Sequence, residues 1–396
     1  MSHEPRSNQT RAYRAGTILS MSPKARPLDN GLLIIDNGRV ADIGPWDQLR
    51  KTYSGPIEDL GACILVPGLI NAHSHLELSH LQGQTTLDHG FETWVSSLLT
   101  LPMKEIDEQS LASAIDMILA GGTACVADVT GHSPRRVLAS LENSRLEFRL
   151  FLEFLGFSRP KTQKPAWPEG LNPNKNSRLG ATGHALYSTH PSTLQQIKTW
   201  SLDNNRTYVM HLAEHPGEFD LLTTGRGDFA EMISSILLPD DYVAPGLTPV
   251  AYADRLGLLD SCTLAVHCVR VTDEDIHLLA DRRASVCLCP RSNALINVGR
   301  APWEKLHEQG VPLCLGTDSL ASNQDLDMWA ELEYFAYRWE GPPLSLAELL
   351  KMATVNPARA LKLEDRLGTL EKGKLARFSL VPERLAALPF TDRKPG

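Results

Sequence analysis

From residue 63 onward, short apolar runs alternate with longer stretches of helical periodicity, and this alternation constrains the fold more than any other feature of the sequence. It is typical of repeated strand–helix units built around a parallel sheet. The strand candidates in this part of the chain lie at 64–71, 123–128, 146–155, 179–187, 207–211, 263–267, 285–289 and 312–316. Because a (β/α)8 barrel needs eight such units, the sequence predicts an α/β fold of the TIM-barrel type.

The residues before this region carry a different pattern. Strand-like runs at 31–35 and 39–43 are separated by the pair Asn37-Gly38. This pair predicts a tight β-hairpin, because both central positions of a type I′ turn need a positive φ.

Short β-strand patterns also return near the end of the chain, at 367–370 and 378–381. We therefore expect residues 1–66 and 363–396 to form one composite β-sandwich domain. The barrel, residues 67–362, would then be inserted between the two parts of that domain.

The composition excludes several classes of protein and partner. Of the 396 residues, 42% are hydrophobic, 22% charged and 6% aromatic, which is the balance of a globular chain and not of a disordered or fibrous one. The formal net charge of −8 argues against nucleic acid as a partner, since an acidic chain repels a phosphate backbone. No apolar run approaches the roughly 18 residues of a membrane span. Formation of a homo-oligomer is left open.

The N-terminal segment and the cysteines bear on location. Residues 1–8 carry charges with no apolar run behind them, so no secretory signal is expected. The seven cysteines are an odd number and lie mostly in apolar runs, where cysteine behaves as a small buried hydrophobe. Reduced thiols of this kind predict a cytoplasmic protein.

His73-Ser74-His75 ends the first predicted barrel strand. Residues i and i+2 of a strand face the same way, so both imidazoles can point into the mouth of the barrel, where such enzymes keep their catalytic groups. Taken alone, the motif fits a metal site and two solvated histidines in a loop equally well.

Three further candidates, His211, His267 and Asp318, end or follow other predicted strands, and Glu214 lies three positions beyond His211. Three imidazoles and one carboxylate suit one divalent ion, Zn²⁺ or Fe²⁺, and leave a coordination position for water. The residues expected to bind this metal are His73, His75, His211 and Asp318.

The remaining two residues then have catalytic interpretations. Glu214 can carry a proton from the bound water to a leaving group, and His267 can orient the water or stabilise developing charge. Simpler interpretations stay open: Glu214 as a surface carboxylate, His267 as a core histidine, and Asp318 as the N-cap of a helix.

The candidate residues lie in four longer motifs, which are Pro67-Gly-Leu-Ile-Asn-Ala-His-Ser-His75, His211-Leu-Ala-Glu214, Cys289-Pro-Arg-Ser-Asn293 and Leu315-Gly-Thr-Asp-Ser319. In their order along nearly the whole chain, these motifs resemble the amidohydrolase superfamily, and more narrowly its chlorohydrolase and nucleoside-deaminase branch. The resemblance implies a TIM barrel with a composite β-sandwich, one divalent metal ion, and hydrolytic removal of ammonia from a purine-like ring. One metal is favoured over two, because segment 181–188 lacks the bridging Lys or Glu of binuclear members.

For the reaction, the resemblance implies water attack on the amino-bearing carbon of an adenine nucleoside. Asp318 would accept the proton of the water, Glu214 would protonate the ring nitrogen, and His267 would steady the alkoxide. The phrase around Arg291 resembles deaminases acting on aminodeoxyfutalosine, a benzoate-bearing nucleoside of the menaquinone route, and we predict this substrate first. S-adenosylhomocysteine, methylthioadenosine and adenosine stay open, as do triazines, guanine and cyclic amides. A non-catalytic scaffold is the remaining alternative.

Four residues are expected to contact the substrate. Arg291 can bind a carboxylate bidentately, although a solvated surface position is open to it. His184 resembles the substrate-contacting histidine of the family. Glu92 could hydrogen-bond ribose hydroxyls and Trp94 could line the base pocket, and the surface of a helix suits both equally well.

Overall fold

The computed structural model describes residues 10–23, 25–160, 165–338 and 344–390. The chain divides into two compact units. One comprises the residues up to Asn71, Asp116–Cys125 and the residues from Asp327 onward; the other comprises Ala72–Ile115 and Val126–Leu326. The predicted domain limits at 66/67 and 362/363 stay a prediction.

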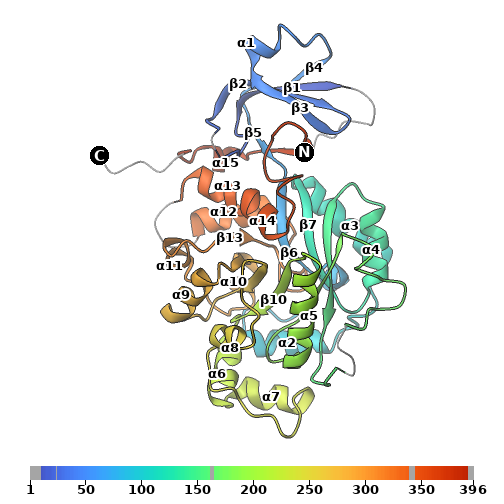
Figure 1. The fold of residues 1–396 in the computed structure, drawn as a ribbon, viewed down its shortest axis with the longest axis vertical. Coiled ribbons are helices and arrows are strands. Elements are labelled where there is room, and N and C mark those ends of the chain that lie inside the picture. The colour runs from blue at the N-terminus through green and yellow to red at the C-terminus, as the bar shows by residue number, and fades with distance from the viewer. Residues whose placement is uncertain (1–9, 24, 161–164, 339–343, 391–396) are drawn as a thin grey trace. The chain divides into compact units, whose positions relative to one another are not determined.

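Eight parallel strands form a nearly closed barrel in the order β13-β12-β11-β10-β9-β8-β7-β6, which is the order of the sequence (Figure 1). A parallel bridge between Ser74 and Asp318 joins the two ends of that order. The predicted TIM barrel is thereby confirmed. Its strands are β6 (Leu69–Ser74), β7 (Thr123–Thr130), β8 (Glu147–Phe154), β9 (Leu179–Gly183), β10 (Tyr208–Leu212), β11 (Thr263–His267), β12 (Ser285–Leu288) and β13 (Leu313–Leu315).

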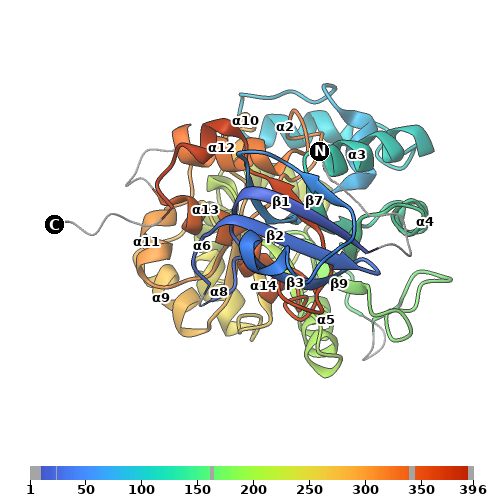
Figure 2. The ribbon, with the colours of Figure 1, turned by 90° about the horizontal axis from the view of Figure 1, so that it is seen from above.

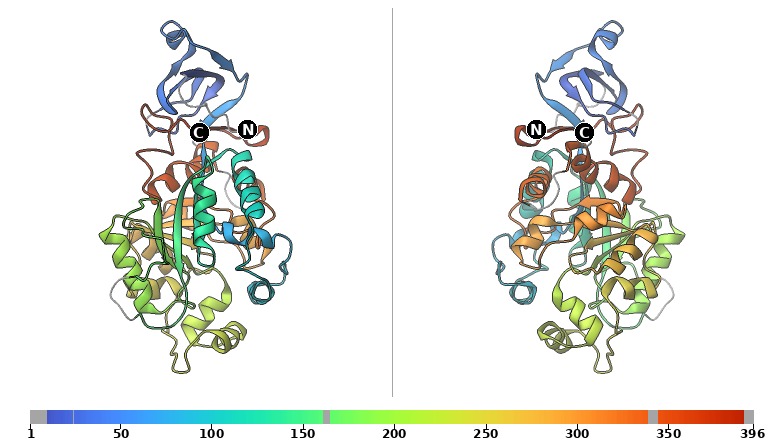
Figure 3. Two further views of the ribbon diagram at one scale, coloured as in Figure 1. Left: turned by 90° about the vertical axis from the view of Figure 1, so that its right-hand side faces the viewer. Right: turned by 90° about the vertical axis from the view of Figure 1, so that its left-hand side faces the viewer.

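Barrel strands such as β7 are buried along their whole length, since one face lies in the barrel and helices cover the other. Figure 3 shows these helices, among them α4 and α5, on the outer side of the strands. Described helices between β6 and β13 are η1 (Leu76–Leu81, a 3₁₀-helix), α2 (Phe91–Leu99), α3 (Glu108–Ala120), α4 (Pro134–Glu142), α5 (Pro191–Asp203), α6 (Pro216–Thr224), α7 (Asp228–Ile236), α8 (Pro249–Arg255), α9 (Asp273–Asp281), α10 (Pro290–Leu295) and α11 (Trp303–Glu308).

Local sequence explains where several of these helices begin. Proline occupies the first turn of α4, α5, α6 and α8, where its missing N–H group costs no hydrogen bond. Thr272 caps α9: its side chain accepts from the Asp275 N–H, and the Asp275 side chain accepts from the Thr272 N–H. None of the described helices is long and apolar enough to cross a membrane.

Six strands form a second, mixed sheet in the order β14-β5-β1-β2-β3, with β4 paired to β1. Figure 2 shows β1, β2 and β3 side by side. The positive φ values of Asn37 (50°) and Gly38 (72°) match the type I′ turn, so the predicted hairpin is confirmed. The strands are β1 (Arg11–Ile18), β2 (Leu28–Asp36), β3 (Arg39–Pro45), β4 (Ile57–Asp59), β5 (Ile64–Pro67) and β14 (Phe378–Leu380).

Residues from both ends of the chain share the core of this sheet. Tyr13 and Leu33 pack with Leu370 and Phe378 in one buried cluster. The predicted strand at 367–370 is wrong, because this segment forms a bend in which the Leu370 N–H donates to the Ser20 carbonyl. The remaining described helices are α1 (Trp46–Leu49), α12 (Met328–Arg338), α13 (Leu346–Ala353), α14 (Val355–Ala360) and α15 (Glu383–Ala386).

The first predicted barrel strand, 64–71, is divided in the structure. Its first half is β5, which pairs with β1 and β14 in the mixed sheet, and its second half begins β6 of the barrel. Gly68 lies between the two halves, where an added Cβ would come 2.6 Å from the Cβ of Ala124. A side chain at this position would therefore clash at the point where the chain passes from one sheet to the other.

Candidate active site

Six polar side chains meet at the carboxyl ends of four barrel strands, β6, β10, β11 and β13. All of them are buried or nearly so. These are the residues that the sequence predicts for metal binding and catalysis: His73, His75, His211, Glu214, His267 and Asp318. The structure brings all six together, while their roles stay predictions.

Three of the histidines point their Nε2 atoms at one another. Nε2 of His211 lies 3.2 Å from Nε2 of both His73 and His75. Oδ1 of Asp318 lies 3.7 Å from His73 Nε2 and 3.8 Å from His75 Nε2. Two tetrahedral ligands bound at about 2.0–2.1 Å lie roughly 3.3 Å apart, so these separations suit donors around one shared cation.

Contacts behind the donor atoms hold them in this orientation. Nδ1 of His211 lies 3.0 Å from the carbonyl oxygen of His184. Because a carbonyl only accepts, Nδ1 carries the proton. Nε2 therefore keeps its lone pair, which faces the space between the histidines where a cation would bind. The hydroxyls of Ser292 and Ser322 donate to Oδ2 of Asp318 at 2.7 and 3.0 Å, which leaves Oδ1 facing the histidines.

The protonation states also suit a metal ion. Burial lowers the pKa of His73 and His211 well below the usual histidine value, so both rings are neutral at pH 7. Burial raises the pKa of Asp318, but His73, His267, His75 and the Ser292 hydroxyl outweigh that effect and bring its pKa to about 2. Neutral imidazoles and an ionised carboxylate are the forms that bind metal, so the residues present fit a divalent ion.

Glu214 and His267 stand beside this group. Oε1 of Glu214 lies 3.5 Å from Nε2 of His267. Burial raises the pKa of Glu214 well above its usual value, and the carboxylates of Asp318 and Glu218 raise it further, so Glu214 holds a proton where a free glutamate would not. Nδ1 of His267 lies 2.9 Å from Oδ1 of Asn293, which orients the ring.

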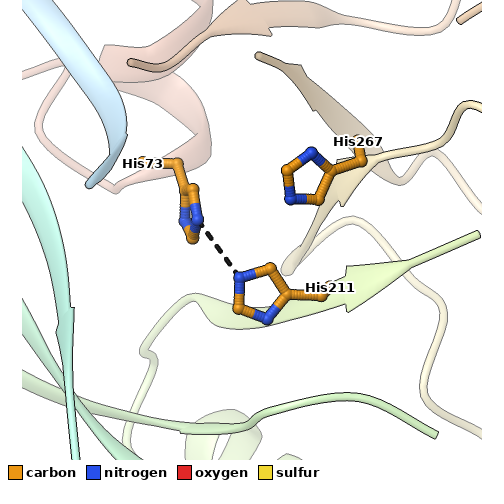
Figure 4. A group of neighbouring side chains, drawn as sticks. All are labelled: His73, His211 and His267. Atoms are coloured by element: carbon orange, nitrogen blue, oxygen red, sulfur yellow. Dashed lines mark hydrogen bonds between the residues drawn. The ribbon is translucent and has the colours of Figure 1, made fainter. Parts of the chain in front are cut away.

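Figure 4 shows the rings of His73, His211 and His267 turned toward a common space. One donor atom from each lies within 4.8 Å of the others. His267 is therefore close enough to serve as a further metal ligand, in addition to the catalytic role that the sequence predicts for it.

Two carboxylates that the sequence analysis did not single out hold the segment that follows His75. Oδ1 of Asp128 accepts from the Leu76 N–H at 2.7 Å. Glu77 accepts from the Thr130 hydroxyl at 2.6 Å and from the N–H groups of residues 131–133 at 2.8 to 2.9 Å. These bonds fasten the end of β6 to the end of β7.

A cavity of about 300 Å³ opens beside the six residues, a volume at the lower end of the roughly 300–1,000 Å³ of small-molecule sites. Trp94 and His184 line it, as the sequence predicts for substrate-binding residues. Among the described residues that line the cavity, none is Lys or Arg. Its apolar wall comprises Leu78, Phe91, Trp94, Val95, Leu98, Leu99, Met103, Leu155, Phe229, Met232, Ile233, Ile236 and Leu237.

The other two predicted substrate contacts are not among the lining residues. The guanidinium of Arg291 is paired with both carboxylate oxygens of Asp325 at 2.6 and 2.8 Å. Oε1 of Glu92 lies against α6, where a Cβ added to Gly217 would come 2.7 Å from it. Contacts from Arg291 and Glu92 to a substrate stay predictions.

Glu153 of β8 is a lining residue that sequence reasoning missed. It is the one acidic residue in the run Leu150-Phe-Leu-Glu-Phe-Leu155, near the carboxyl end of a predicted strand, and that position is the feature that could have revealed it. Burial raises the pKa of Glu153 to about 8, and the nearby carboxylate of Glu77 adds to the effect.

Comparison with known proteins identifies the family. The model of the amidohydrolase family matches residues 64–394. The chain belongs to the amidohydrolase family. Similar proteins include the 5-methylthioadenosine/S-adenosylhomocysteine deaminase of Syntrophobacter fumaroxidans, 29% identical over 93% of this chain and 84% of its own. The aminodeoxyfutalosine deaminase of Deinococcus radiodurans is 26% identical over 78% of this chain and 77% of its own.

Solved structures of similar proteins share the fold. The Helicobacter pylori aminofutalosine deaminase in complex with methylthio-coformycin has a TM-score of 0.81 at 24% identity, covering 93% of this chain and 91% of its own. An adenosine deaminase from Xanthomonas campestris with bound zinc has a TM-score of 0.75 at 24% identity, covering 95% and 85%. The family and the deaminase relatives together support a hydrolytic deaminase.

Proposed function

We propose that the protein hydrolytically deaminates an adenine nucleoside that carries an uncharged, apolar group on C5′, as in 5′-methylthioadenosine, with the help of one divalent ion, Zn²⁺ or Fe²⁺. The observation that carries this proposal is the cavity, which joins a centre of neutral histidines and carboxylates to an apolar wall. The names of the deaminase relatives support the adenine nucleoside class.

His73, His75, His211 and Asp318 are the residues that would hold the ion. When bound, it supplies Lewis acidity that lowers the pKa of water and makes water a nucleophile at neutral pH. The Nε2 atoms and Oδ1, already turned toward one another, need little rearrangement to accept it.

The proton transfers fall to Glu214 and Asp318. In the reaction, the oxygen of water bonds to C6 of the adenine ring, the C6–N bond breaks, and ammonia and the hypoxanthine nucleoside are released. Asp318, ionised and directed at the metal site through Oδ1, accepts a proton from the attacking water and passes it to the amino nitrogen, which leaves C6 as ammonia, while the remaining proton on the C6 oxygen returns to Glu214. Glu214, held protonated by burial, donates to ring nitrogen N1, and His267, oriented by Asn293, stabilises the charge on the oxygen bonded to the tetrahedral C6.

The apolar wall accounts for the proposed 5′ substituent. Met232, Ile233 and Ile236 of α7 line the cavity, as do Leu99 and Leu155. Of these side chains, Ile236, Leu99 and Leu155 are exposed. Burying an apolar group against such side chains gains about 25 cal/mol per Å² of surface removed from water. Among the described residues that line the cavity there is no Lys or Arg to pair with a carboxylate in the same place, and burying a carboxylate without such a partner is unfavourable.

Aminodeoxyfutalosine, the substrate predicted first from the sequence, is the second candidate. The aromatic and aliphatic side chains of the cavity wall would accept its aryl ring. Its carboxylate would need a cation, and Arg291 could serve only by exchanging the carboxylate of Asp325 for that of the substrate.

A panel assay of ammonia release tests the proposal. It compares 5′-methylthioadenosine, S-adenosylhomocysteine, aminodeoxyfutalosine and adenosine with guanine and an aminotriazine. We expect kcat/KM to be highest for 5′-methylthioadenosine, by about 10-fold or more over the two carboxylate-bearing nucleosides. Higher values for the carboxylate-bearing nucleosides would refute the uncharged substituent, and turnover of guanine or the triazine alone would refute the nucleoside.

A further inference from the structure

Glu153 is a carboxyl group in the cavity, and one of its oxygens has no hydrogen-bond partner among the described residues. It lies one residue before the carboxyl end of β8 and lines the cavity. Its Oε1 atom is buried and has no hydrogen bond to any residue in the described part of the chain. Gly131 leaves room for Oε2, since a Cβ at residue 131 would lie only 3.3 Å from that atom. Buried carboxylate oxygens are almost always hydrogen-bonded, so this one is suited to a donor that comes from a ligand.

A metal ion does not fit this position well. A carboxylate oxygen of Glu153 and ring nitrogens of His184 and His211 lie within 4.8 Å of one another. However, Nδ1 of His211 is bonded to the His184 carbonyl, and its Nε2 faces His73 and His75. Nδ1 of His184 contacts the Ser188 hydroxyl at 2.6 Å. Glu153 and one nitrogen of His184 remain, which is too few donors for a cation but enough for a hydroxyl-bearing ligand.

The other carboxylates of the cavity are already engaged. Glu77 accepts four hydrogen bonds from residues 130–133. Glu214 and Asp318 belong to the catalytic centre. Glu153 is therefore the acidic lining residue that is left, among those the structure describes, to recognise the polar part of a substrate.

Burial raises the pKa of Glu153 to about 8, and two hydroxyl donors beside the group favour its ionised form, whose two oxygens can accept from both hydroxyls at once. In an adenine nucleoside, the vicinal hydroxyls are those on C2′ and C3′ of ribose. We infer that Glu153, with His184 beside it, binds the ribose hydroxyls of the substrate and selects ribonucleosides over deoxynucleosides. This inference rests on the proposed function and moves to Glu153 the contact that the sequence predicts for Glu92.

The test compares ribose and deoxyribose substrates in wild-type protein and in the variants Glu153→Ala and Glu153→Gln. Adenosine, 2′-deoxyadenosine and 3′-deoxyadenosine serve as the matched substrates, and kcat/KM is measured for each. We expect wild type to prefer adenosine by about 10-fold or more. Glu153→Ala should lose about 10-fold on adenosine and little on the deoxy compounds, so that the preference disappears.

The matched control is Glu231→Ala, the same change at an exposed position of α7, which should keep the preference of the wild type. Metal content and circular dichroism of each variant show whether the fold and the centre persist, and Glu153→Gln keeps the volume of the side chain if Glu153→Ala does not fold. An unchanged ribose preference in both Glu153 variants would refute ribose binding by Glu153, and so would an equal loss of kcat/KM on all three nucleosides. Neither result would refute the proposed function. Wild-type protein that deaminates no nucleoside would overturn the proposed function together with the subsite.

Discussion

At the scale of single residues, the site depends on backbone conformations that most side chains avoid. Ala213, His267 and Asp318 have φ values of 54°, 75° and 59°, in the left-handed region. Such conformations cost about 1–3 kcal/mol each and occur where the surrounding structure enforces them. Here they turn the chain at the ends of three strands, and the turn at Ala213 carries the chain from His211 to Glu214.

Replacement of Glu214 by Gln tests the proton transfer assigned to it. The amide keeps the size of the side chain but cannot deliver the proton that burial holds on the carboxyl group. We expect kcat for ammonia release to fall by about 100-fold or more. The bound metal, measured by elemental analysis, should not change, because Glu214 is not among the proposed ligands.

The matched control is Glu231→Gln, the same chemical change at an exposed position of α7. It should retain the activity of the wild type. If Glu214→Gln is as active as this control, Glu214 is not the acid, and if it loses its metal, Glu214 acts as a ligand.

At the scale of elements, Glu371 connects the two ends of the chain within the mixed-sheet unit. Its carboxylate accepts from the hydroxyls of Ser22 and Thr369 at 2.8 and 2.6 Å, and Lys374 Nζ lies 2.9 Å away. The bonds from Thr369, Lys374 and Ser22 lower the pKa of Glu371 to about 2 from its ordinary value of 4.5.

This lowered pKa predicts a pH-dependent contribution to stability. The unfolded chain binds a proton at Glu371 at a higher pH than the folded chain does, so the stabilisation is complete above about pH 4.5 and is lost as the pH falls toward 2. Glu371→Gln should therefore unfold at a lower temperature than wild type at pH 6, and the difference in Tm should shrink as the pH is lowered. The measurement is thermal unfolding of both proteins across this range; a Tm difference independent of pH would show that the charge of Glu371 does not contribute.

The elements also show how far the sequence could predict the fold. Apart from 64–71, each predicted barrel strand corresponds to an observed one within a few residues, because buried apolar runs between helical stretches have few other ways to fold. The division of 64–71 between two sheets was missed, because nothing in an apolar run tells which sheet it joins. The run at 367–370 was predicted as a strand because it is apolar. In the structure it forms a bend, and its residue Leu370 packs into the core of the mixed sheet.

At the scale of the whole molecule, the six central residues of the site could be predicted because the barrel brings the carboxyl ends of its strands together. His73, His211 and Asp318 are far apart in sequence but adjacent once the strands are in order. The pairing of Arg291 with Asp325 could not be predicted, because it joins α10 to the segment between β13 and α12. The cavity position of Glu153 could not be predicted either, because it depends on which face of β8 the side chain takes.

The metal content of the purified protein tests the central claim most directly, when it is measured by elemental analysis alongside ammonia release. We predict about one divalent ion per chain in wild type, activity that falls with chelation and returns when the ion is restored, and a loss of both in His211→Ala. Wild-type protein that deaminates an adenine nucleoside at full rate after its metal has been removed would contradict the account.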